Sequence, residues 1–171
     1  MPKKKRNYIL PLKRRKEKKT NYNRRLKLLL SKKPRLVVRK SLKYTYAQII
    51  KYKKDADQTM VSCSSKDLLK FGWNGSCSNV PAAYLTGFLI GKKAVKNKIK
   101  SAVLDVGLQS CTKGGKIYAV LKGAIDAGLN IPKSEKTEEM FPSEDRIKGK
   151  HIKDKEIEKI FNSVKAKIEK S

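Results

Sequence analysis

The hydrophobic positions of the chain change their period after residue 64, and the two patterns predict different elements. Three segments rich in β-branched and aromatic residues follow Pro34, at residues 35–40, 44–52 and 58–64. Such residues favour strands. Short polar turns separate the three segments, and short connections join antiparallel neighbours. The sequence therefore predicts a three-stranded antiparallel meander.

The pattern then becomes helical. Residues 65–71 are expected to form a helical turn or two, and residues 72–78 have the composition of a loop. Asn79 is a typical cap for the next helix, which is apolar nearly all round and should run, buried, to about Asn97. Small residues recur every four positions on one side of this helix and would let it lie close against a sheet. They are Ala83, Gly87 and Gly91.

Another strand and two more helices complete the predicted elements. Residues 101–106 form a buried strand, and its place after a helix implies a crossover onto the sheet. Residues 116–128 form an amphipathic helix. Residues 132–153 are expected to be a loop. Asp154 is expected to cap a last helix, which packs either on this chain or on a neighbour. The apolar face of that helix carries Ile157, Ile160, Phe161, Val164 and Ile168.

These elements define an α/β (α+β) fold, in which helices pack on a mixed sheet that contains the meander. We expect three regions: a basic arm over residues 1–33, a core domain over residues 34–131, and a tail with its helix over residues 132–171. The longest apolar stretch, residues 80–90, is far shorter than the roughly 20 residues that cross a bilayer. No membrane partner is expected.

Charge changes the picture most. Lys and Arg number 43 against 15 Asp and Glu, so the net charge is +28. Residues 1–33 carry 15 of these cations and one acid, Glu17, with little to bury. We expect this arm to order only on a polyanion, with a short helix starting near Thr20 or Asn21. Nucleic acid would relieve the repulsion and release counterions, and an anionic membrane surface is the other polyanion to consider.

Patterns typical of catalysis or metal binding are missing from the sequence. Cys63, Cys77 and Cys111 are 14 and 34 residues apart, which is not the paired spacing of a zinc site, so we expect neither metal nor cofactor. His151 is the only histidine, which disfavours a catalytic triad. Asp105 is expected to bind backbone N–H groups of the next turn. We predict no enzyme and no small-molecule substrate.

The loop and helix start at Gly114-Gly115-Lys116 lack the remaining residues of a P-loop. An RNA phosphate could bind there, and a plain helix start is the alternative.

The predicted RNA-binding residues combine cations with aromatic and polar side chains. Arginine forks suit phosphates, and exposed aromatic rings can stack on unpaired bases. Arg35 and Arg39 are four apart on one strand, so both should lie on a basic face, with Leu36 and Val38 on the apolar face behind it. The full set is Arg14, Arg15, Lys19, Tyr22, Arg24, Arg25, Arg35, Arg39, Ser41, Lys43, Tyr46, Gln48, Trp73, Asn74, Lys113 and Lys116.

Several sequence blocks resemble a known family. They are Pro34 to Ser41, Lys70 to Trp73, Pro81 to Gly87, Leu104 to Leu108, Thr112 to Gly114, and Arg146 to Ile152. They resemble the universal large-subunit ribosomal proteins that bind 5S rRNA, number eighteen of the bacterial series, in the archaeal and eukaryotic form. The resemblance covers roughly residues 13–152. It departs at Asn21, where the archaeal pattern has an acid, and at Leu42, where it has Asn.

The resemblance implies a structural protein of the cytoplasmic ribosome that clasps 5S rRNA with its arm and sheet. It also implies attachment of that RNA to large-subunit rRNA in the central protuberance, beside neighbouring ribosomal proteins. Two other classes share the charge. A DNA-compacting protein would show no preference for folded RNA, and an RNA-processing enzyme would need acids or histidines that the sequence does not group.

Overall fold

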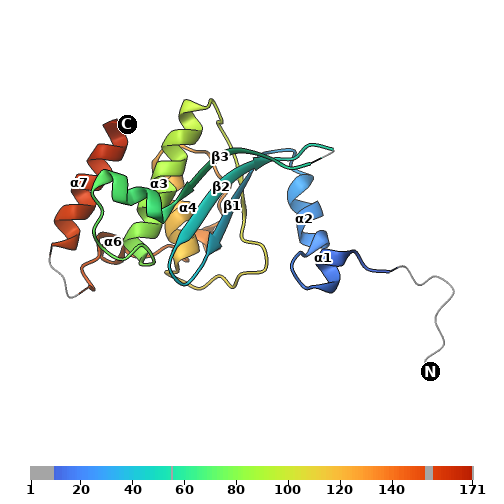
Figure 1. Ribbon diagram of the computed structural model, residues 1–171, viewed down its shortest axis with the longest axis horizontal. Coiled ribbons are helices and arrows are strands. Elements are labelled where there is room, and N and C mark those ends of the chain that lie inside the picture. The colour runs from blue at the N-terminus through green and yellow to red at the C-terminus, as the bar shows by residue number, and fades with distance from the viewer. Residues whose placement is uncertain (1–9, 55, 153–155, 171) are drawn as a thin grey trace, which may run out of the picture.

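The fold is built on a four-stranded mixed sheet (Figure 1), seen in a computed structural model that describes residues 10–54, 56–152 and 156–170. Its strand order is β3-β2-β1-β4. The strands are β1 (Arg35–Lys40), β2 (Thr45–Lys51), β3 (Gln58–Ser64) and β4 (Val103–Asp105). The first three are antiparallel, and β4 pairs with β1 in parallel. The meander, the crossover and the α/β fold class are confirmed.

β4 is shorter than the predicted strand over residues 101–106. Its first residues pair elsewhere, because Ser101 forms an isolated parallel bridge with Asn130 and the Ala102 N–H donates to the Asn130 carbonyl at 3.1 Å.

Two long helices, α3 (Val80–Lys96) and α4 (Lys116–Asp126), cover one face of the sheet (Figure 1). The predicted cap of α3 is confirmed, since Asn79 Oδ1 accepts from the Ala82 N–H at 2.9 Å. The face of the sheet beneath these helices carries Leu36 and Val38, both with no exposed surface. This is the apolar face that the strand pattern predicted.

Gly87 and Gly91 of α3 face α4 and not the sheet, so that part of the prediction was wrong. A Cβ on Gly87 would come within 2.0 Å of the Val120 carbonyl oxygen. A Cβ on Gly123 of α4 would come within 2.2 Å of the Tyr84 carbonyl oxygen. The two backbones approach each other where both helices have glycine.

Shorter helices complete the core. Residues Ser65–Phe71 form a 3-10 helix, η1, which confirms the predicted helical turns. The predicted loop over residues 132–153 was wrong in part, because it contains α5 (Glu135–Glu138) and α6 (Glu144–Lys148). Both of these helices have acids in the first turn, where the helix dipole favours negative charge.

The last helix, α7 (Ile157–Lys170), packs its apolar face on this chain. It lies against α3 and η1. The predicted apolar face is confirmed, with four residues buried and Ile160 half-buried. The expected cap, Asp154, lies outside the described residues. The four buried residues are Ile157, Phe161, Val164 and Ile168.

The described part of the arm holds α1 (Lys13–Lys16) and α2 (Tyr22–Leu29) at one end of the molecule (Figure 1). The predicted start of α2 is confirmed, since Asn21 Oδ1 accepts from the Arg24 N–H at 3.1 Å. Neither helix buries a residue. The three-region division of the chain, and the ordering of the arm on a polyanion, remain predictions.

Candidate nucleic-acid interface

The face of β1 turned away from α3 and α4 carries Arg35 and Arg39, as the spacing predicted. Arg35, however, has only 4% of its surface exposed. Its Nη1 binds Asp105 Oδ2 at 2.8 Å, and its Nη2 binds Asp57 Oδ2 at 2.7 Å. The expectation that Arg35 stands open to RNA was wrong, because two carboxylates from outside β1 close over it.

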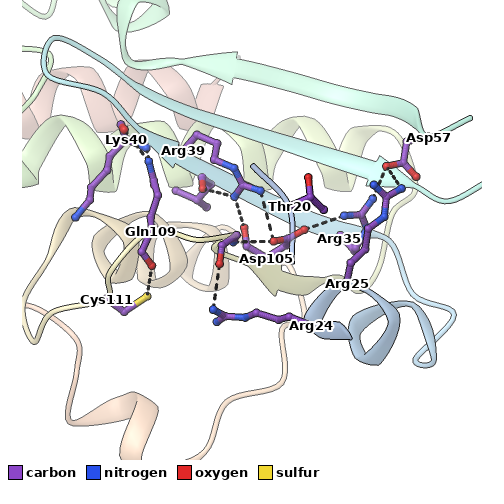
Figure 2. Close-up of polar contacts among 12 residues, drawn as sticks. Thr20, Arg24, Arg25, Arg35, Arg39, Lys40, Asp57, Asp105, Gln109 and Cys111 are labelled. Atoms are coloured by element: carbon purple, nitrogen blue, oxygen red, sulfur yellow. Dashed lines mark hydrogen bonds and ion pairs between the residues drawn. The ribbon is translucent and has the colours of Figure 1, made fainter. Parts of the chain in front are cut away.

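The sheet register explains how one carboxylate reaches both arginines. Asp105 of β4 lies opposite Val37, midway between Arg35 and Arg39. Arg39 Nη1 donates to the carbonyl oxygens of Asp105 and Val38, each at 2.8 Å, and Nη2 lies 3.5 Å from Asp105 Oδ1 (Figure 2). The Arg39 side chain keeps 41% of its surface exposed. These contacts fix its guanidinium while leaving part of it free for a ligand.

Asp105 also has the role that its place at a strand end predicted. Its Oδ1 accepts from the Gly107 N–H at 2.9 Å, which stabilises the turn after β4. The same turn contacts the arm, because Arg24 Nη1 donates to the Gly107 carbonyl oxygen at 3.0 Å. Asp105 therefore organises β1, the turn and, through Gly107, helix α2.

A second carboxylate ties the arm to the sheet. Asp57 Oδ2, in the loop between β2 and β3, binds Arg25 of α2 at 2.8 Å and Arg35 of β1 at 2.7 Å (Figure 2). The Asp57 side chain is only 25% exposed, which shields these ion pairs from solvent. The arm and the strand thus line one cavity of about 210 Å³, which also includes Arg14 and Lys19.

The other predicted residues lie on the sheet face, at the far end of β1, in the loop before α3 and in the arm. Tyr46 and Gln48 extend the face of Arg39, since they pair with Arg39 and Val37 across β1 and β2. Ser41, Lys113 and Lys116 lie together at the far end of β1, and Lys43 is exposed in the hairpin turn that follows this strand. Asn74 is exposed in the loop before α3, and the structure does not bring it to the sheet face or to the far end of β1. The exposed members of the arm are Arg14, Arg15, Lys19 and Arg24, while Tyr22 and Arg25 are half-buried.

Trp73 was wrongly predicted as a surface for base stacking. Only 2% of it is exposed, and its Nε1–H donates to the Ser76 carbonyl oxygen at 3.3 Å. A Cβ on Gly75 would lie 3.0 Å from the indole ring, so the loop wraps closely round it. Trp73 therefore anchors the loop over residues 72–78 within the core.

The sequence reasoning missed a groove of about 610 Å³ at the far end of β1. Its lining includes Lys40, Leu42 and Arg146, besides the predicted Lys113 and Lys116. Two signals were available: Arg146 belongs to a block of the family resemblance, and Gly114-Gly115-Lys116, considered above as a phosphate site or a plain helix start, also line the groove. Nothing in the spacing of the sequence joins Arg146 to a hairpin turn more than 100 residues earlier.

The cysteines do not form a metal site in the part of the chain that the structure describes. No group of three His, Cys, Asp or Glu residues there could hold a metal ion. Burial raises the pKa of the Cys63 thiol to about 12, so it stays protonated at neutral pH. The described residues also include no helix with the length and apolarity to cross a bilayer.

The fold and this surface define a small, strongly basic α/β protein whose arm and open sheet face suit a polyanion. The chain belongs to the family described as ribosomal large subunit proteins 60S L5 and 50S L18, which matches residues 6–101 and 96–134. It is similar to large ribosomal subunit protein uL18 of Methanococcus maripaludis, at 52% identity over 146 residues. That alignment covers 85% of this chain and 74% of the relative.

Membership of this family makes the protein a structural component of the large ribosomal subunit, in the cytoplasmic ribosome, and not an enzyme. Its partners are accordingly ribosomal RNA and other ribosomal proteins.

Proposed function

We propose that the arm and the outer face of the sheet bind 5S rRNA and help attach it to large-subunit rRNA in the central protuberance. Neighbouring proteins of the protuberance would be its further partners. The ion-pair chain that joins Arg25, Asp57, Arg35, Asp105 and Arg39 carries this proposal. It connects the arm to the sheet, so that the two present one basic surface.

The chemistry of that surface fits folded RNA. Arginine guanidinium groups bind phosphate oxygens through two donors at once, and Arg39 is held in a fixed orientation for such a contact. Tyr46 beside it is 44% exposed, which leaves ring surface for an unpaired base. The cations bind phosphates of any nucleic-acid sequence, and the exposed ring can stack on an unpaired base. This combination suits RNA with single-stranded parts better than uniform duplex DNA.

The resemblance of the sequence blocks supports 5S rRNA as the particular ligand. The motifs that carry the resemblance include the run from Pro34 to Ser41, which contains the whole of β1. The strand that organises the basic surface thus lies within a block that carries the resemblance.

A competition experiment tests the proposal. The full-length protein is bound to labelled 5S rRNA and challenged with unlabelled 5S rRNA or duplex DNA at equal phosphate. We expect 5S rRNA to compete at least tenfold better. Equal competition would favour a DNA-compacting protein and overturn the proposal.

Charge-matched variants locate the surface. Arg15→Gln with Lys19→Gln removes two exposed cations of the arm, and Lys70→Gln with Lys96→Gln removes two exposed cations outside the proposed surface. Binding should weaken at least tenfold for the arm pair, because each lost contact to phosphate costs about tenfold. The control pair should stay within a few fold. Equal losses for both pairs would mean that only net charge matters.

A further inference from the structure

The groove at the far end of β1 is walled on one side by the hairpin turn between β1 and β2. Ser41 holds this turn, since its N–H donates to the Tyr44 carbonyl oxygen at 2.8 Å and its Oγ accepts from the Tyr44 N–H at 3.0 Å. Lys40 is fixed by Gln109, whose side chain binds the Lys40 N–H at 3.0 Å and its carbonyl oxygen at 2.8 Å. The wall is therefore preformed.

The opposite wall is the loop over residues 112–115 with the side chains beside it. The loop is closed on itself and on the tail, because the Gly115 N–H donates to the Thr112 carbonyl oxygen and the Gly114 N–H to the Met140 carbonyl oxygen. Lys116 Nζ donates to Ser78 Oγ at 2.8 Å. Arg146 lies alongside Gly114, with Nη1 3.6 Å from where a Cβ would stand. A rigid, open groove of about 610 Å³ remains between the walls.

The character of the lining indicates an anionic ligand with an apolar part. Among the residues that the structure describes, the lining includes four cations and no carboxylate. Leu42 stands at the tip of the hairpin turn with 96% of its surface exposed, and Val80 contributes a further apolar side chain. A leucine held out by a fixed turn beside a cationic groove can contact a ligand in that groove. The four cations are Lys40, Lys113, Lys116 and Arg146.

We infer that this groove holds one unpaired nucleotide of the bound rRNA, with its base against Leu42 and the Arg146 side chain. The phosphates on either side of the base lie against Lys40, Lys113 and Lys116. The inference rests on the proposed function, because it names a second contact for the same class of ligand. A cavity of this size is within the range that small-molecule ligands occupy, and it is larger than a lone carboxylate needs.

The combination of charge and shape favours RNA over an acidic peptide. Unstacked RNA bases are commonly bound by stacking on arginine planes, with their phosphates on nearby cations. A peptide carboxylate would be satisfied by one or two of the four cations. It would leave the others, and the exposed leucine, without a partner.

The groove is a contact separate from the arm. β1 begins at Arg35, beside the arm, and ends at Lys40, beside the groove. Figure 2 shows Lys40 and Arg25 at opposite ends of the strand. Five residues of strand span roughly 17 Å. A protein that grips RNA at both places fixes its orientation, which one cluster of cations at either end would not do.

Cross-linking tests where the base lies. A photo-reactive benzophenone side chain replaces Leu42 in the full-length protein, and a matched protein carries it in place of Leu69, which is 50% exposed outside the groove. Each is bound to 5S rRNA and irradiated. We expect position 42 to cross-link to one unpaired nucleotide and position 69 to give no specific product. Cross-links from position 42 to paired nucleotides only, or none at all, would overturn the inference.

The affinity of variants for 5S rRNA provides the second part of the test. Lys113→Gln with Arg146→Gln removes two exposed cations of the groove, and Lys70→Gln with Lys96→Gln is the charge-matched control. We expect at least a tenfold loss for the groove pair, a smaller loss for Leu42→Ala, and unchanged thermal unfolding. If the groove pair binds 5S rRNA like the control pair while the arm pair does not, the proposed function stands and the groove inference fails. If the groove pair keeps its affinity for 5S rRNA but loses binding to another ribosomal protein, the groove inference also fails, in favour of an acidic peptide. If wild-type protein shows no preference for 5S rRNA over duplex DNA, the proposed function itself fails.

Discussion

At the scale of single residues, Arg35 and Arg39 show that the same side chain on the same strand face can serve different purposes. Arg35 is buried between two carboxylates, and Arg39 is fixed by one carboxylate and two carbonyls but stays partly exposed. The difference comes from Asp57, which lies at the Arg35 end of β1 only. Arg35 belongs to the folded structure, whereas Arg39 belongs to the binding surface.

The Arg35→Ala variant should therefore have a lower free energy of unfolding than the wild type. It leaves the buried Asp105 carboxylate without its shortest ion pair, and breaking a buried pair typically costs about 3–5 kcal/mol. Urea denaturation of the free protein measures this loss. Exposed ion pairs contribute only about 0–1 kcal/mol. A free energy of unfolding within about 1 kcal/mol of wild type would therefore contradict the buried role of Arg35.

Arg39→Ala and Val38→Ala should separate binding from folding. Losing a charged hydrogen bond to phosphate should weaken 5S rRNA binding by about 1.5–3 kcal/mol, while the lost carbonyl contacts cost about 1 kcal/mol of stability. Val38 has no exposed surface, so Val38→Ala should lower stability by about 1–3 kcal/mol and leave binding by the folded protein unchanged. Melting temperature and RNA affinity are measured for both. The opposite assignment of effects would mean that the two faces are reversed.

Cys63 should resist alkylation at pH 8. Its thiol is buried and has a pKa of about 12, and only the thiolate reacts. Cys77 and Cys111 are half-buried and should react sooner with iodoacetamide. Peptide mapping at increasing times gives the order, with urea-unfolded protein as the control in which all three react. Early labelling of Cys63 in folded protein would show that its burial is incomplete.

At the scale of elements, α3 and α4 approach each other backbone to backbone. Gly87 and Gly123 each face the backbone of the other helix, at positions where a Cβ would meet a carbonyl oxygen. No side chain separates the helices there. The pair forms a rigid layer that supports the inner face of the sheet, and so keeps the outer face in shape for a ligand.

Gly123→Ala should be destabilising although alanine is the better helix former. Overpacking of a close contact costs about 1–3 kcal/mol of stability, whereas alanine gains roughly 1 kcal/mol over glycine in helix propensity. The cost exceeds the gain if the two helix backbones cannot move apart. Thermal unfolding measures the net effect, and Ser163→Ala on the exposed side of α7 is the control. A rise in melting temperature for Gly123→Ala would show that the two helices can move apart.

The elements were more predictable than the side-chain environments. Branched and aromatic residues predicted the three meander strands, a long apolar run with its cap predicted α3, and a repeating apolar face predicted α4 and α7. Periodicity could not find α5 and α6, which are too short to show a period. It also misplaced Arg35 and Trp73, since their burial depends on Asp57, Asp105 and Ser76, which the sequence does not mark as partners. The groove was missed for the same reason.

At the scale of the whole molecule, the net charge of +28 is distributed unevenly. The arm holds half of it, and the described arm helices bury no side chain. Self-repulsion at this density disfavours a compact free chain, and a polyanion relieves it. Ion pairs through Asp57 and Asp105 oppose the repulsion at one point, where the arm meets the sheet.

Hydrogen exchange should show this balance. The amides of residues 10–33 should exchange quickly in the free protein and slowly in the complex with 5S rRNA, since α2 has eight residues and no buried residue to stabilise it. The amides of α3 provide the internal control, protected in both states. Strong protection of the arm without RNA would contradict its ordering on the ligand.

The central claim, that folded RNA is held by a basic arm and sheet, is tested most directly by the salt dependence of 5S rRNA binding. Equilibrium affinity of the full-length protein is measured between 50 and 200 mM monovalent salt. A protein that makes about 6–10 phosphate contacts loses roughly three to five decades of affinity over this range on duplex DNA, and we predict similar steepness here. An affinity that hardly changes with salt would contradict the account.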